Sequence, residues 1–182
     1  TTTFGVSGLL YNTNIIPYDR ATNSNWSQLL LKSVNGELKG TKAITFNLVE
    51  TSWKTWREMY PQSKVVSTST GFSRSYGLYP YADYKTSERL IFPVNNLDNR
   101  LHLKERVLAV LINEKAMAFR FSTLNANNNL INAAFQGKKM VVAGSENANI
   151  MMAFNRILND GTELEFQYLP DQLPSILKDN EG

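Results

Sequence analysis

The chain has 182 residues, of which 42% are hydrophobic, with a formal net charge of +3 and no cysteine. Without cysteine it cannot form disulfides, thiolate nucleophiles or Cys-ligated zinc sites, and its single histidine, His102, excludes a multi-histidine metal site. Because Lys and Arg are scattered and no apolar run approaches the ~20 residues that span a bilayer, we expect no nucleic-acid binding, no membrane span, no metal and no cofactor.

The N-terminal part of the chain combines short β-type runs with one helix. Strands are expected at residues 3–10, 26–31, 43–49 and 64–67. One short helix is expected near residues 52–60, because Thr51 or Ser52 can cap its N-terminus and Pro61 ends it. A cap of this kind contributes about 1 kcal/mol to the stability of a helix.

The C-terminal part is expected to consist of antiparallel hairpins. Residues 107–112 and 116–121 flank the polar pair Asn113-Glu114, which suits a tight turn. Residues 150–158 and 162–168 flank a turn containing Asp160-Gly161, and polar and apolar side chains alternate along the second of these runs. Further strands are expected at 130–135 and 139–143.

These elements predict a mainly β fold of the α+β class. Antiparallel hairpins would form a sheet or sandwich, with one short helix and long ordered loops. No linker or low-complexity segment divides the sequence, so we expect a single domain over residues 1–182.

The first candidate site is the polar segment Tyr18–Gln28, which contains Asp19 and Arg20 next to Thr, Asn and Ser residues. Such side chains can hydrogen-bond their own backbone, which predicts a closed turn with Trp26 in the core. The functional alternative is that Asp19 and Arg20 face a cleft.

The second candidate site is the segment Gly71–Tyr84, which holds five aromatic rings, Arg74 and Asp83 without helix or strand periodicity. Tyrosine rings and an arginine on a loop suit a planar or sugar-like ligand. In the alternative, the loop is fastened over the core and Arg74 pairs with Asp83. The candidate ligand-binding residues are Arg20, Arg74, Tyr76, Tyr81, Asp83 and Tyr84.

Catalytic chemistry has three candidate acid or base groups, which are Asp19, Asp83 and His102. His102 is the one side chain that ordinarily exchanges a proton near neutral pH, although a lone histidine is commonly a satisfied turn residue. Nucleophile-elbow, phosphate-loop, zinc-protease and dinucleotide motifs are all missing from the sequence.

Several motifs along the chain resemble one bacterial family. They are TFGVSGLLYN at 3–12, YDRATNSNWSQ at 18–28, RSY at 74–76 and YADY at 81–84, with further matching text at 89–93 and 104–108. These motifs are long and cover nearly the whole chain, which resembles the family catalogued as domain of unknown function 3179. The resemblance brings no activity with it.

The resemblance implies an internal repeat. Members of the family look like two copies of a unit in which a hairpin leads into a Tyr-Asp-Arg-type turn and then a Trp strand. Here Thr3-Phe4 would match Glu165-Phe166, and residues 19–23 would match residues 178–182.

We therefore expect a fragment of a larger pseudo-repeat protein, with a first repeat at 1–70, a connecting loop at 71–104 and the start of a second repeat at 105–182. Relative to the family, the chain lacks an upstream strand and the second Trp strand. The strand at 3–10 is then expected to lie at a sheet edge or to pair with another chain.

The composition and the resemblance together favour an extracytoplasmic bacterial domain that binds a small molecule or glycan through the aromatic, Arg and Asp groups. An enzyme of hydrolase type, with Arg20 or Arg74 stabilising an anion, is the second hypothesis. A structural or interaction domain without a small-molecule site is the third.

Overall fold

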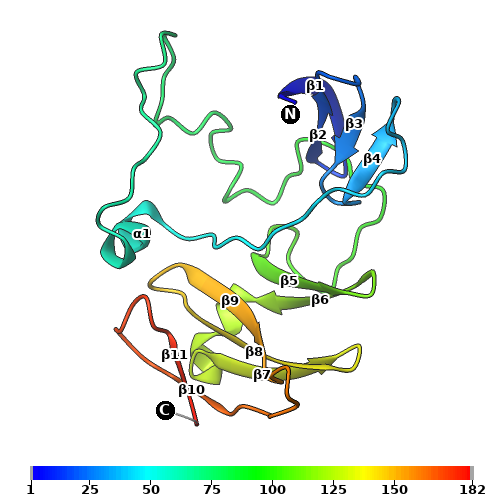
Figure 1. Cartoon of the computed structure of the whole chain (residues 1–182). Coiled ribbons are helices and arrows are strands. Elements are labelled where there is room, and N and C mark those ends of the chain that lie inside the picture. The colour runs from blue at the N-terminus through cyan, green and yellow to red at the C-terminus, as the bar shows by residue number, and fades with distance from the viewer. Residues whose placement is uncertain (1, 181–182) are drawn as a thin grey trace. The chain divides into compact units, whose positions relative to one another are not determined.

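A computed structural model of the chain describes residues 2–180, whose fold is mainly β (Figure 1). These residues contain eleven strands in four antiparallel sheets, which confirms the expected fold class. The strands are β1 Phe4–Tyr11, β2 Asn14–Asp19, β3 Asn25–Ser27, β4 Lys32–Asn35, β5 Val107–Ile112, β6 Lys115–Arg120, β7 Leu130–Phe135, β8 Lys138–Ser145, β9 Ile150–Asn155, β10 Phe166–Tyr168 and β11 Leu177–Asp179. The helices are α1 Trp53–Met59 and the short 3₁₀ turns η1 Phe121–Thr123 and η2 Asn125–Asn127.

The described residues form two compact units. The first contains the chain up to Asn47 together with Gly77–Lys104. The second contains Leu48–Tyr76 and the chain from Glu105 onward. The expectations of a single domain and of a fragment of a pseudo-repeat protein stay predictions.

The first unit is built on one sheet with the strand order β1-β2-β3-β4. Its first connection is the pair Asn12-Thr13, which has φ angles of 47° and 65°, as a two-residue hairpin turn requires. A bulge interrupts the pairing of β1 between Val6 and Leu9. As expected, β1 lies at an edge of this sheet.

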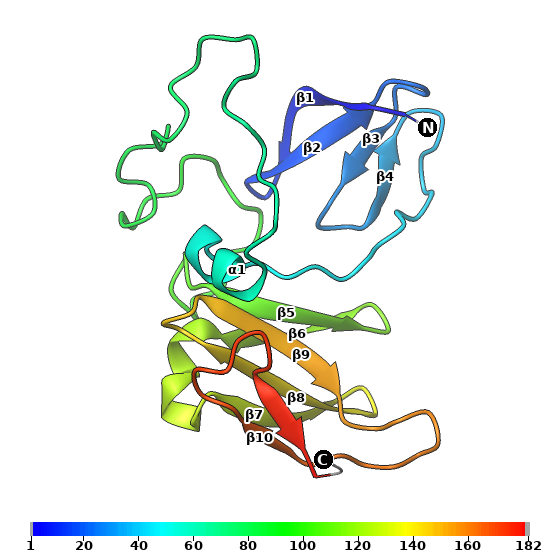
Figure 2. The same ribbon diagram turned by 60° about the vertical axis from the view of Figure 1, so that its left-hand side comes forward.

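The second unit has a hydrophobic core between the β5–β6 hairpin and the β7-β8-β9 sheet (Figure 2). Asn113-Glu114 forms the expected tight turn of the hairpin, with φ angles of 50° and 61°. The central strand β8 is buried on both faces from Met140 to Ala143, as a middle strand under cover should be. The buried core residues are Phe119, Leu124, Met140, Val142 and Met151.

Helix α1 begins at the expected cap, because the Ser52 Oγ accepts the backbone N–H of Thr55 at 3.1 Å. Thr55 is buried and donates its own hydroxyl to the backbone oxygen of Ala148 at 2.7 Å. Thr51 donates to the same oxygen at 3.1 Å. Hydroxyl groups therefore anchor the helix to the turn between β8 and β9.

Three expected strands differ in the structure. The expected strand at 26–31 is confined to β3, because residues 28–31 turn the chain into β4. Residues 43–49 and 64–67 belong to no strand of the described chain. Both of these segments have strand-like sequences without a neighbouring strand to supply hydrogen bonds.

The expected hairpin at 150–168 forms only next to its turn. There the backbone N–H of Leu158 donates to the oxygen of Thr162 at 2.9 Å, the N–H of Leu164 donates to the oxygen of Arg156 at 2.7 Å, and Ile157 bridges Glu163. Farther from the turn, β9 pairs with β8 through six residue pairs and β10 pairs with β11. The pairing of β9 with β8 buries Ile150 and Met151. The alternation at 163–168 is nevertheless confirmed, with Leu164 buried between exposed neighbours.

Gly144 sets a limit on how β8 and β9 can pair. A Cβ at this position would lie 2.1 Å from the backbone oxygen of Ile150 and 2.8 Å from the Cα of Met151. We expect Gly144→Ala to lower the free energy of unfolding by about 2–3 kcal/mol, because backbone must move to relieve the clash. The measurement is urea denaturation followed by far-UV circular dichroism.

The matched control is Gly137→Ala, at the turn between β7 and β8. There an added Cβ meets nothing within 4 Å, and only the positive φ of 72° is strained. We expect a loss of about 1 kcal/mol. Equal losses for the two variants would contradict the close approach at Gly144.

Candidate functional site

Asp19, at the end of β2, is a buried carboxylate with a full set of donors. Its side chain is 2% exposed. It accepts hydrogen bonds from the backbone N–H of Thr22 at 2.7 Å, from the Thr22 hydroxyl at 2.8 and 2.9 Å, and from the indole N–H of Trp26 at 2.9 Å. These contacts make Asp19 the centre of the turn between β2 and β3. They agree with the prediction of a closed turn for this segment.

The indole N–H of Trp26 is the main cause that lowers the pKa of Asp19 to about 2. Burial raises this pKa, but the donors of Thr22 and Ser24 add to the lowering. The carboxylate is therefore ionised at neutral pH, which suits a structural acceptor better than a general acid. Arg20 is exposed, and its guanidinium donates to the Tyr18 hydroxyl at 3.1 Å.

Three tyrosines, Tyr79, Tyr81 and Tyr84, form a group that we name the tyrosine cluster. The ring centroids of Tyr79 and Tyr81 are 5.6 Å apart in an edge-on arrangement, and those of Tyr81 and Tyr84 are 6.4 Å apart. Tyr79 is 42% exposed and Tyr81 is 53% exposed. The cluster thus presents aromatic surface to solvent.

Local turns bring these rings together. The backbone N–H of Tyr84 donates to the oxygen of Tyr81 at 3.0 Å, and the N–H of Ser87 donates to the oxygen of Asp83 at 3.0 Å. The Asp83 carboxylate pairs with Arg89 at 2.8 Å, with both side chains exposed. An ion pair so exposed contributes about 0–1 kcal/mol, so the turns are held mainly by backbone contacts.

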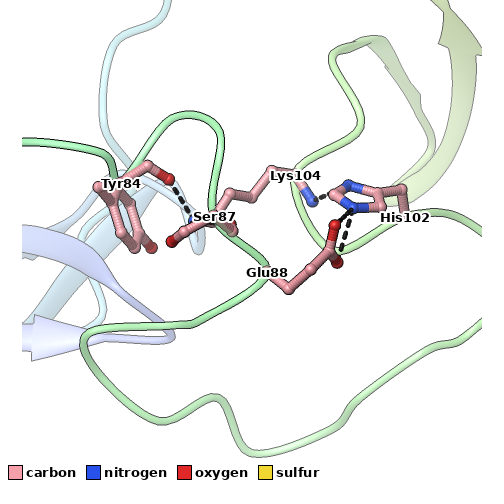
Figure 3. A network of polar contacts seen from close by, with 5 residues as sticks. All are labelled: Tyr84, Ser87, Glu88, His102 and Lys104. Carbon is pink, nitrogen blue, oxygen red and sulfur yellow. Dashed lines mark hydrogen bonds and ion pairs between the residues drawn. The ribbon is translucent and has the colours of Figure 1, made fainter.

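Lys104 fastens this segment from 17 to 20 residues away (Figure 3). Its ammonium donates to the backbone oxygens of Tyr84 and Ser87, the latter at 2.6 Å. The same ammonium lies 3.7 Å from the centroid of the Tyr84 ring. The ammonium of Lys85 lies 4.5 Å from the Tyr79 ring centroid.

His102 and Glu88 form a second polar pair beside Lys104, as Figure 3 shows. The His102 Nε2 lies 2.7 and 2.8 Å from the two carboxylate oxygens of Glu88. Because the backbone N–H of Lys104 donates to Nδ1 at 3.2 Å, the ring proton belongs on Nε2, which donates to Glu88. Both side chains are exposed.

The structure gathers part of the expected site in one segment of the first unit. Of the expected residues, Tyr81, Asp83, Tyr84 and His102 fall between residues 79 and 104. Arg74 and Tyr76 belong to the second unit, where the Tyr76 hydroxyl lies 2.6 Å from the Thr70 hydroxyl. A ligand-binding role for Arg20, Arg74 and Tyr76 and a catalytic role for Asp19 or Asp83 stay predictions.

Sequence reasoning placed Tyr79 among the five rings of the second candidate site, but it missed Lys85 and Glu88 and did not connect Lys104 with these rings. Glu88 and Lys104 contact partners 14 to 20 residues away with no periodic spacing, so the sequence carries no signal for them. Within residues 2–180, no group of three His, Asp or Glu side chains could hold a metal ion, and no helix is long and apolar enough to cross a membrane.

A family model described as "Protein of unknown function (DUF3179)" matches residues 1–181. The chain belongs to the DUF3179 family. No curated protein and no solved structure matches it. The DUF3179 match spans both the Asp19 turn and the tyrosine cluster, and the family description names no substrate or reaction. The geometry of these two groups is therefore the basis for a functional proposal.

The lowered pKa of Asp19 predicts an acid-dependent loss of stability. Its ordinary pKa is 3.8 and its folded value is about 2. The unfolded chain therefore binds more protons between about pH 4 and 2, so stability falls as the pH falls through this window. We expect Asp19→Asn to lower the melting temperature at pH 7 but to make it less dependent on pH in this window.

The measurement is thermal unfolding of both proteins from pH 7 to pH 2. Hydrogen bonds with Arg100 also lower the pKa of Asp98 to about 2. Because Asp98 is unchanged in both proteins, the difference between the two curves reports Asp19. Parallel curves for wild type and Asp19→Asn would contradict the proposed role of this carboxylate.

Proposed function

We propose that this DUF3179 chain binds a glycan, or a small molecule of similar size, through the tyrosine cluster. The observation that supports this most is the exposure of Tyr79 and Tyr81 while their neighbour Tyr84 is held by Lys104. Aromatic surface that is both fixed and exposed can bind a ligand at low entropic cost.

The chemistry around the rings suits a sugar. Tyrosine faces offer apolar contact to the C–H groups of a pyranose, and their hydroxyls can donate or accept hydrogen bonds. Asp83, Lys85 and Arg89 add charged groups of both signs beside the rings. A site of this kind combines apolar contact with a few polar groups that fix the orientation of the ligand.

Two further expectations belong to this proposal. One is an extracytoplasmic location, where a glycan ligand would be met. The other is the internal repeat, with which the strand registers agree to within one residue: Phe4 pairs with Asp19 in the first unit, and Phe166 pairs in the second with Asp179, the neighbour of the expected match Lys178. In both hairpins a Phe at the start of one strand faces an Asp at the end of the other.

Glycan binding is tested by isothermal titration calorimetry with maltotriose and trigalacturonate, a neutral and an acidic trisaccharide. We expect at least one of them to bind, and Tyr81→Ala to weaken that binding by about tenfold or more, equal to about 1.4 kcal/mol. The loss follows from removing the ring that contacts both of the other tyrosines.

Phe72→Ala is the matched control, because Phe72 is an exposed ring on the same long irregular stretch of chain but outside the cluster. Its binding should equal that of wild type. A wild-type chain that binds neither sugar with a Kd below about 1 mM would overturn the proposal for these glycans.

Acid–base catalysis is a second candidate, favoured by the pair His102–Glu88. A carboxylate at 2.7 Å orients the imidazole, as in many catalytic pairs. If the chain is a hydrolase, turnover of p-nitrophenyl glycosides or esters should fall at least ~100-fold in His102→Asn. Equal rates for wild type and His102→Asn would exclude this role for the pair.

A further inference from the structure

The segment that connects β4 to α1 has the sequence of a strand, but apart from an isolated bridge between Lys42 and Lys32 it pairs with no strand of the described chain (Figure 1). Residues 42–50 read Lys-Ala-Ile-Thr-Phe-Asn-Leu-Val-Glu. Ile44, Phe46 and Leu48 stand at every second position and are 96%, 80% and 76% exposed. Within the described chain, the backbone of residues 44–50 takes part in no backbone–backbone hydrogen bond. The segment is therefore able to accept a strand.

The order of side chains in this segment is self-complementary. In an antiparallel pair of identical strands centred on Phe46, residue i faces residue 92 − i of the other copy. Ile44 then faces Leu48, Phe46 faces Phe46, and Lys42 faces Glu50. These five residues lie on one face of the strand, because side chains alternate with a period of two.

We propose that residues 42–50 of two copies of this chain pair as antiparallel strands about a two-fold axis at Phe46. The arrangement covers three exposed apolar side chains on each copy and supplies both segments with backbone hydrogen-bond partners. It also places a Lys–Glu pair at each end of the shared ladder.

The charges favour the antiparallel orientation of two copies. A parallel in-register pair would place Lys42 beside Lys42 and Glu50 beside Glu50, which repel. The antiparallel pair replaces both repulsions with attractions, and its two-fold symmetry closes the assembly at a dimer.

Lys42 and Glu50 both have partners within the chain already, and these do not prevent the pairing, because an ammonium group has three N–H donors and a carboxylate has two oxygens. Glu50 forms an ion pair with Arg106 at 2.9 Å, yet its side chain is 79% exposed. The contact uses one carboxylate oxygen, Oε1. Glu50 can therefore also receive a lysine from a partner strand.

The first test measures the dimer dissociation constant of the full chain by sedimentation equilibrium. We expect a dimer in the micromolar range, and Phe46→Lys should raise the Kd by at least about tenfold because it places two like charges at the two-fold axis. The substitution spares the core, since Phe46 is exposed. Thr45→Lys, one residue away on the opposite face, is the matched control and should dimerise like wild type.

The second test exchanges the end charges. Lys42→Glu and Glu50→Lys should each weaken the dimer, whereas the double variant, in which the two opposed charges have changed places, should restore the wild-type Kd within about threefold. The double variant does not restore the pair with Arg106, so rescue reports the contact between copies. A monomeric wild type at about 100 μM, a Phe46→Lys variant that dimerises normally, or a double variant as weak as the singles would each overturn the proposal.

Discussion

The chain must supply hydrogen-bond partners to long stretches of backbone that lie outside helices and strands. Regular ladders satisfy their own N–H and C=O groups, but an irregular segment depends on side chains or water. In this protein single charged groups do that work in the first unit. Asp19 accepts hydrogen bonds from N–H and O–H groups of the turn after β2, and Lys104 donates hydrogen bonds to the carbonyl oxygens of Tyr84 and Ser87. The shapes of both candidate sites follow from these two groups.

The two charged groups have different consequences for function. The carboxylate of Asp19 is enclosed by its hydrogen-bond donors, so its role is to hold the turn. Lys104 lies beneath Tyr84 and leaves the neighbouring rings of Tyr79 and Tyr81 open to solvent. We therefore propose that the rings bind the ligand and that the aspartate holds the turn. The exposed strand-like segment around Phe46 is proposed as a separate surface for a second copy of the chain.

The sequence predicted what depends on neighbours along the chain. The β5–β6 hairpin follows from the turn pair Asn113-Glu114, and the start of α1 follows from Ser52. The pairing of β9 was not predicted, because the turn signal Asp160-Gly161 follows this strand, whereas its ladder is formed with the preceding strand β8, where Ile150 and Met151 are buried. The candidate sites differ in the same way. The Asp19 turn is closed by a hydrogen bond between residues seven positions apart, whereas Glu88 and His102 are fourteen positions apart in the sequence.

The central claim is that ligand binding belongs to the tyrosine cluster and not to the Asp19 turn. The most direct measurement is a two-dimensional NMR titration of the ¹⁵N-labelled chain with the trisaccharide that binds. The account predicts that the largest shift changes fall on residues 79–89 and 102–104, with the indole signal of Trp26 unmoved. Largest changes at residues 19–26, or changes spread evenly over the chain, would contradict it.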